Sequence, residues 1–260
     1  MRPLIGTSWK MHFTATQAGA YLAALRPLVA EIADRDLFVL PPFAAIFVAR
    51  DRLAGSNVAW GAQDVHPEDW GAHTGDVSAP MLADLDCRYV EVGHSERRRD
   101  HGETPDLIAA KVGAVLRWGM TPILCVGEAH HRGPVAALAD VLPDLERCLA
   151  GVSADALHRI VIAYEPVWAI GEHATAAAPK EIRAVHVGIH AWLRGHAPGG
   201  ETVRVIYGGS VDETVAPLVL GQPGVDGLFV GRRALDPAAF ATIARVPILP
   251  AAAPLETTIS

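Results

Sequence analysis

Residues 160–171 read IVIAYEPVWAIG and reveal how this chain is organised. The first five residues, Ile160–Tyr164, form an apolar run typical of a strand that is buried on both faces. The run ends at a carboxylate, Glu165. The residues that follow have the composition of a short apolar lid: Pro166, Val167, Trp168, Ala169 and Ile170. The segment therefore predicts a general base fixed at a strand end, beside a lid that closes and excludes water.

Similar short apolar runs recur along the whole chain and predict further strands at 4–9, 37–40, 58–61, 89–92, 121–126, 203–207 and 227–230. Segments with helical composition alternate with them, near 15–31, 43–53, 78–85, 104–118, 134–149, 178–194, 212–220 and 237–244. Eight strand–helix units without a break in composition favour an α/β fold with a single (β/α)₈ TIM barrel. A dinucleotide-binding sheet is disfavoured, because no Gly-x-Gly-x-x-Gly pattern follows the first strand. The barrel is expected over residues 1–246, and the Pro- and Ala-rich residues 247–260 are expected to be a surface tail.

The composition disfavours some classes of partner and indicates the cellular location of the protein. The 260 residues are 50% hydrophobic and carry a net charge of −7, with one short basic cluster at 97–99, which disfavours nucleic acid and anionic membranes as partners. No signal peptide and no membrane span are predicted. The scattered cysteines Cys87, Cys125 and Cys148 suit a reducing cytoplasm, and their spacing does not match a zinc site.

Polar and glycine-rich residues follow the strands at the positions where barrel enzymes carry their active sites. They are Lys10, His94-Ser95-Glu96, Glu165, Gly208-Gly209-Ser210 and Gly231-Arg232. Each alone has an ordinary explanation as a surface cation, a core histidine, a strand end or a turn. Because the carboxyl ends of parallel strands meet on one face of a barrel, their joint occurrence there predicts an active site.

These residue types suit the removal of a proton from a carbon next to a carbonyl group. Glu165 would take the proton, and Lys10 would stabilise the negative charge that develops. His94 precedes a polar stretch that is expected to form a helical turn, and a helix N-terminus favours a neutral, hydrogen-bond-donating imidazole. A phosphate group would bind to backbone amides of Gly171, Ser210, Gly231 and Arg232.

The motifs together resemble the triosephosphate isomerase family. The resemblance rests on the segments 6–12 (GTSWKMH), 93–98 (GHSERR), 125–128 (CVGE), 163–171 (AYEPVWAIG) and 207–211 (YGGSV), which occur in the family's order. It implies an aldose–ketose isomerase of a small sugar phosphate that acts through an enediolate and uses no cofactor and no metal. The family is known for a Glu base, a neutral His and a closing lid, so this mechanism is carried over from it.

The resemblance also assigns individual roles. It implies that Glu165 is the base, His94 the electrophile and Lys10 the electrostatic anchor. Glu96 would support Lys10, and Ser95 would contact Glu165 when the lid is open. Residues 71–76 resemble a loop that inserts into a second subunit, which implies a homodimer with Thr74 near the partner's Lys10.

Three positions depart from the family pattern. Ser8 stands where the family has Asn, residues 173–176 (HATA) replace the usual lid hinge, and Arg232 replaces a glycine of the strand-eight loop. These departures resemble a sister branch that isomerises four-carbon erythrulose phosphates in tetritol breakdown. A triose phosphate is therefore the expected substrate and a tetrose phosphate the alternative. A sugar-phosphate-binding barrel without activity is a remote alternative, and a lyase or synthase is disfavoured by the lid motif.

Overall fold

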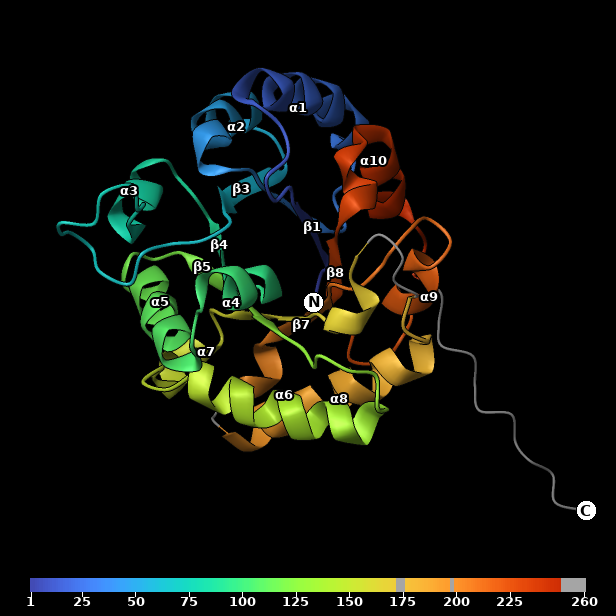
Figure 1. Ribbon diagram of the computed structural model, residues 1–260. Helices are drawn as coiled ribbons and strands as arrows, with labels where there is room; N and C mark the ends of the chain where they lie inside the picture. The colour runs from blue at the N-terminus through green and yellow to red at the C-terminus, as the bar shows by residue number, and fades with distance from the viewer. Residues whose placement is uncertain (172–175, 197–198, 249–260) are drawn as a thin grey trace, which may run out of the picture.

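The computed structural model describes residues 1–171, 176–196 and 199–248. Eight parallel strands close into a barrel in chain order, and β8 pairs with β1. The strands are β1 Leu4–Ser8, β2 Asp36–Leu40, β3 Val58–Ala62, β4 Tyr89–Val92, β5 Thr121–Val126, β6 Val161–Tyr164, β7 Arg204–Tyr207 and β8 Gly227–Val230. The predicted (β/α)₈ barrel is confirmed, and every strand lies where the apolar runs predicted it (Figure 1).

Helices surround the barrel. The longer ones are α1 Ala15–Val29, α2 Ile46–Leu53, α5 Pro105–Arg117, α6 Pro134–Cys148, α8 Pro179–His196 and α10 Pro237–Arg245. The shorter ones are α3 Ala79–Asp84, α4 Ser95–His101, α7 Ala154–Leu157 and α9 Ala216–Leu220, with 3₁₀ turns η1 Phe43–Ala45, η2 Val167–Ala169, η3 Gly200–Thr202 and η4 Arg232–Leu235. Within the described ranges, no helix is both long and apolar enough to cross a membrane.

Three helices differ from the sequence prediction. The segment after His94 was expected to form one turn, but α4 continues to His101 and ends at Gly102 in the left-handed conformation. The four-residue helix α7 was not predicted, because one turn is too short to show a helical period. Helix α9 begins later than expected, since the Asp212 carboxylate accepts the amides of Thr214 and Val215 and holds a turn there.

The core has two layers, one inside the barrel and one between the barrel and its helices. The interior layer contains Leu4, Phe38, Leu40, Tyr89, Ile123, Cys125, Val161, Ala163, Ile206 and Phe229. The outer layer buries the apolar faces of the helices against the opposite faces of the strands. Because both strand faces are covered, the strands read as apolar runs in the sequence. The barrel is thus filled with side chains, and its carboxyl end is left to carry the site.

The predicted domain boundary is not tested by the structure. Helix α10 ends at Arg245, and the described residues reach Ile248. Residues 249–260 of the predicted tail, like residues 173–175 of the predicted lid hinge, lie outside the described residues.

Candidate active site

A cavity of about 1030 Å³ opens at the carboxyl ends of the strands. It brings together nearly all of the residues predicted for the site: Ser8, Lys10, His94, Ser95, Glu96, Glu165, Val167, Ile170, Gly171, Ser210, Gly231 and Arg232. Thr74 lies outside this cavity, on an exposed loop. The joint prediction from the strand ends therefore corresponds to one site in space.

His94 caps the N-terminus of α4, and this contact decides which ring nitrogen carries the proton. The ring Nδ1 accepts the Glu96 amide at 3.1 Å, so the proton of the neutral ring lies on Nε2. Nε2 lies 3.5 Å from Oε2 of Glu165. Burial, together with the charge of Lys10, lowers the pKa of His94 to about 4. His94 is therefore neutral near pH 7 and presents an N–H donor to the cavity.

Glu165 follows β6 and is only 5% exposed. Desolvation raises its pKa, and the nearby charge of Glu91 raises it further. Its Oε2 atom is buried and has no hydrogen-bond partner among the described residues. Gly208 leaves the space this carboxylate needs, because a Cβ there would lie 2.8 Å from Oε1 of Glu165. Gly208, which the sequence predicted to lie in a phosphate-binding loop, therefore also leaves room for the side chain of the base.

The predicted contact between Ser95 and Glu165 is not formed in this structure. No hydrogen bond joins the two side chains, both of which lie in the described part of the chain, and Glu165 faces His94 instead. The predicted contact belonged to an open lid, so it stays a prediction for that state.

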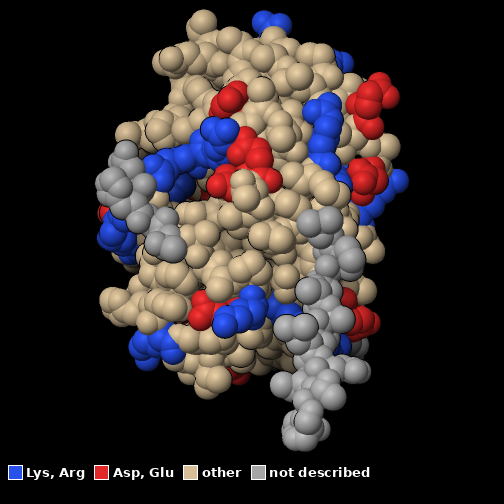
Figure 2. Space-filling model, turned by 90° about the vertical axis from the view of Figure 1, so that its right-hand side faces the viewer, with Lys and Arg blue, Asp and Glu red and all other residues tan. Residues whose placement is uncertain are grey.

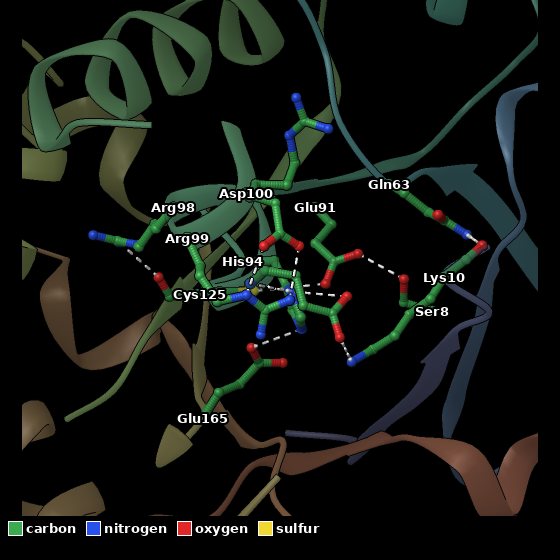
Figure 3. Close-up of polar contacts among 12 residues, drawn as sticks. Ser8, Lys10, Gln63, Glu91, His94, Arg98, Arg99, Asp100, Cys125 and Glu165 are labelled. Carbon is green, nitrogen blue, oxygen red and sulfur yellow. Dashed lines mark hydrogen bonds and ion pairs between the residues drawn. The ribbon is translucent and has the colours of Figure 1, made fainter. Parts of the chain in front are cut away.

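Lys10 occupies the left-handed region, with φ of 53°, which is costly for a residue with a side chain. Two contacts fix this conformation. Its Nζ lies 2.7 Å from Oε1 of Glu96, as predicted. Gln63 donates through Nε2 to the carbonyl of Lys10 at 3.0 Å (Figure 3). The same Nε2 donates to the carbonyl of Leu40 at 2.9 Å. Sequence reasoning missed Gln63, because a single glutamine after a strand gives no signal of this role.

The lid is attached to the barrel through Glu128. This carboxylate accepts hydrogen bonds from Trp168 Nε1 at 2.7 Å and from the Tyr164 hydroxyl at 3.0 Å. The Ala169 carbonyl accepts both the amide of Ser210, at 3.1 Å, and its hydroxyl, at 2.8 Å. The Ser210 amide that was predicted to bind phosphate is thus engaged by the lid in this structure.

Arg232 joins the other end of the lid to the loop after β8. Its Nη2 donates to the carbonyl of Gly171 at 2.5 Å. Gly171 has φ of 129°, a conformation that favours glycine. The side chain that departs from the family pattern therefore contacts the lid directly.

Glu91 is a residue of this cavity that sequence reasoning missed. It lies in β4, is 3% exposed and accepts a hydrogen bond from the Ser8 hydroxyl to Oε2 at 2.7 Å. A signal existed, because a carboxylate in the middle of an apolar strand is unusual when both strand faces are buried. The short side chain of Ser8 in β1 thus meets an acid of β4, a strand that does not neighbour β1 in the barrel.

Two groups of side chains in the described residues have the spacing that a metal ion requires. One comprises Glu91, His94 and Glu165 in the cavity, and the other His66, His73 and Asp76 on the surface. The first group already contains the predicted base and electrophile. The expectation that the reaction uses no metal and no cofactor remains a prediction.

A buried carboxylate beside a neutral imidazole and a lysine, all at the carboxyl end of a closed barrel, is suited to moving a proton between neighbouring carbons. By class, the protein is an aldose–ketose isomerase. Comparison with known proteins narrows this class. The family model described as triosephosphate isomerase matches residues 3–246. The chain therefore belongs to the triosephosphate isomerase family.

Individual relatives agree with the family assignment. The chain is 43% identical to the triosephosphate isomerase of Thermus thermophilus, over 94% of this chain and 98% of that protein. It is 42% identical to that of Roseiflexus sp., over 93% of this chain and 96% of the relative. The crystal structure of triosephosphate isomerase from Bartonella henselae superposes with a TM-score of 0.83 at 33% identity, covering 94% of this chain and 98% of that one.

Proposed function

We propose that this protein interconverts dihydroxyacetone phosphate and glyceraldehyde 3-phosphate. The observation that carries the proposal is the approach of the neutral His94 ring to Glu165, 3.5 Å from Nε2 to Oε2, in a buried cavity. The names of the relatives, all triosephosphate isomerases, support the same substrate.

In the proposed reaction, the Glu165 carboxylate removes a proton from the carbon next to the substrate carbonyl. The electron pair of that C–H bond forms the enediolate, and the carbonyl oxygen takes up the negative charge. The Nε2–H of His94 and the ammonium group of Lys10 stabilise this oxygen. The proton of the neighbouring hydroxyl group passes to the former carbonyl oxygen, and Glu165 delivers the carbon-bound proton to the former carbonyl carbon. The hydroxyl oxygen that lost its proton becomes the new carbonyl oxygen, so the reaction balances without another reactant.

The phosphate group would lie among the amides of Gly171, Gly231 and Arg232. The Ser210 amide would join them once the Ala169 carbonyl, which accepts it in this structure, moves away. Lid movement and phosphate binding would therefore be coupled: a substrate phosphate would compete with Ala169 for the same donor.

Steady-state kinetics on glyceraldehyde 3-phosphate test the proposal. We expect Glu165→Gln to lower kcat by about 10²–10⁴-fold, the usual contribution of a general base. Glu146→Gln, an exposed position on α6, is the matched control and should retain wild-type activity. If the wild type binds but does not turn over triose or tetrose phosphates, the barrel is a binding protein and the proposal is wrong.

A tetrose phosphate is the second candidate substrate, because of the pair formed by Ser8 and Glu91. Their hydrogen bond places a polar pair inside the barrel at the base of a cavity of about 1030 Å³, which has room for a fourth carbon. The kcat/KM for erythrulose phosphates, measured beside that for glyceraldehyde 3-phosphate, separates the two candidates. A preference for the four-carbon substrate would assign the protein to the sister branch.

We further propose that the protein is a cytoplasmic homodimer. Exposed residues close in sequence to Lys10 and Thr74 support a contact surface: Met11 is 97% and Trp70 68% exposed. The loop that carries Thr74 would then lie against the active-site end of a second copy. The three free, buried cysteines support a reducing location.

A further inference from the structure

Glu91 is a buried carboxylate for which the proposed reaction has no role. Side chains alternate along β4, so that Tyr89 and Glu91 point into the barrel and Val90 and Val92 pack outside it. Tyr89 belongs to the apolar interior, whereas Glu91 lies one layer higher and lines the active-site cavity. A carboxylate in this position is costly unless something compensates for its burial.

The contacts of Glu91 come from segments that are far apart in the sequence. The Ser8 hydroxyl of β1 donates to Oε2 at 2.7 Å, and the Cys125 thiol of β5 lies 3.8 Å from Oε1. One carboxylate oxygen of Glu91, one ring nitrogen of His94 and one carboxylate oxygen of Glu165 all lie within 4.8 Å of one another (Figure 3). Glu91 and the predicted base thus share one desolvated space.

The remaining charges around this space are of both signs. The charge of Lys10 stabilises the ionised forms of both Glu91 and Glu165. Lys10 is, however, already paired with Glu96. Glu96 and Asp64 add further negative charge near Glu91. One shared lysine that is already paired does not neutralise two buried carboxylates, so ionising both is unfavourable.

We propose that Glu91 is a positioning residue that titrates as a pair with Glu165 and sets the basicity of the catalytic carboxylate. The inference rests on the proposed role of Glu165 as the base. Glu91 does not take the substrate proton. It acts through its charge, which disfavours ionised Glu165 and makes it a stronger base. The Ser8 hydrogen bond holds the carboxyl group of Glu91 in place.

The direction of the pKa shifts supports this coupling. Desolvation is the main cause that raises the pKa of Glu91, and the Ser8 hydrogen bond and Lys10 oppose it. For Glu165, desolvation comes first, and the charge of Glu91 is the next cause. The competing explanation is that Glu91 only fills the space beside the short Ser8 side chain, which would leave Glu165 unaffected.

Carbon-13 NMR of glutamate carboxyl groups, recorded against pH, distinguishes these explanations without using a substrate. We expect Glu91→Gln to lower the apparent pKa of Glu165 by about one unit, the coupling at which two sites titrate as a pair. In the wild type, the two carboxyl groups should titrate over shared steps, and in Glu165→Gln the titration of Glu91 should reduce to a single step. Glu128→Gln is the matched control: it removes a 4% exposed carboxylate that contacts the lid, and it should shift Glu165 much less.

Kinetics give a second readout that a purely structural role would not change. In Glu91→Gln, the acid limb of kcat/KM should move to lower pH by about one unit. An unshifted Glu165 titration in a folded Glu91→Gln protein would overturn the proposal. If Glu91→Gln does not fold, a Glu91 titration curve that has the same shape in the wild type and in Glu165→Gln overturns it equally. Full turnover by Glu165→Gln would instead refute the proposed function. The NMR titrations would then decide by themselves whether Glu91 and Glu165 are coupled.

Discussion

Burial moves the pKa values of Glu165 and His94 in opposite directions. Desolvation penalises the charged form of each group, so it raises the pKa of the carboxyl group and lowers that of the imidazole. The result is a base stronger than an ordinary glutamate beside a histidine that stays neutral. Enediolate formation requires an ionised carboxylate and a neutral imidazole, so the raised pKa strengthens Glu165 as a base and also moves its activity to higher pH.

The first prediction concerns the pH dependence of activity. Protonation inactivates the base, so kcat/KM should fall as pH falls through the pKa of Glu165, at about 8 and well above the ordinary value of 4.5. His94, with its pKa lowered to about 4, should add no limb above pH 5. Measuring kcat/KM from pH 5 to 10 in wild type and His94→Gln checks this, because the acid limb should be the same in both. A limb that disappears in His94→Gln would mean that the histidine titrates instead.

At the scale of elements, the lid is held at both ends by side chains that belong to other loops. Glu128, after β5, accepts from Trp168, and Arg232, after β8, donates to the Gly171 carbonyl. The second of these contacts depends on a residue that departs from the family pattern. The contact with Gly171 is therefore made by a side chain at a position where the family resemblance predicts a glycine.

The second prediction concerns this contact. Arg232→Ala removes the hydrogen bond to Gly171 but keeps the backbone amide, so kcat/KM should fall by about three- to tenfold, as expected for one exposed charge-assisted hydrogen bond. Arg233→Ala is the matched control, since its guanidinium pairs with Glu213 on the surface. It should change kcat/KM by less than about twofold. Equal losses in both variants would show that the positive charge matters and the lid contact does not.

A buried ionic network connects α5 to the loops after β3 and β4. Lys111 lies 2.6 Å from Asp64 and 2.5 Å from Glu103, and Arg97 contacts the same two carboxylates at 2.8 and 2.6 Å. Lys111 is one of only three lysines in the chain, and its role in this network is structural. The network fixes the end of α4, the helix that His94 caps.

The third prediction follows from the burial of this network. Lys111→Ala leaves two buried carboxylates with one fewer cation, so it should lower the free energy of unfolding by about 3–5 kcal/mol. Arg117→Ala breaks an exposed pair with Asp69 and should cost about 0–1 kcal/mol. Urea denaturation of both variants measures the difference. Equal costs would mean that water reaches the network and screens its charges.

At the scale of the whole molecule, charge is distributed without a single dominant patch on the face seen in Figure 2, where basic and acidic side chains lie beside one another. Among the exposed apolar side chains, Met11 and Trp70 lie on the loops after β1 and β3, whereas others such as Val135 lie on the helices. This distribution suits contact with a second protein surface better than contact with a polyanion.

The fourth prediction tests the homodimer. Light scattering after size exclusion should give twice the chain mass for the wild type and the monomer mass for Thr74→Arg, because a charge on the loop tip would be buried without a partner. Val135→Arg, at an 85% exposed position on α6, is the control and should remain a dimer. A monomeric wild type would show that the proposed assembly is wrong.

The sequence by itself determined the eight strands, the barrel and the face on which Lys10, His94 and Glu165 lie. These features depend on local patterns: apolar runs of strand length, and polar residues placed just after them. Because parallel strands share one carboxyl end, a residue that follows a strand is assigned to the active-site face before any contact is known.

Only the tertiary structure decided which side chains meet there. The contact between Ser8 and Glu91 spans 83 positions in the sequence and depends on how β1 and β4 face each other across the barrel. The left-handed conformation of Lys10 and the engagement of Ser210 by Ala169 likewise depend on neighbours that are distant in the chain. Barrel closure and register set these contacts, and no local pattern of residues encodes either.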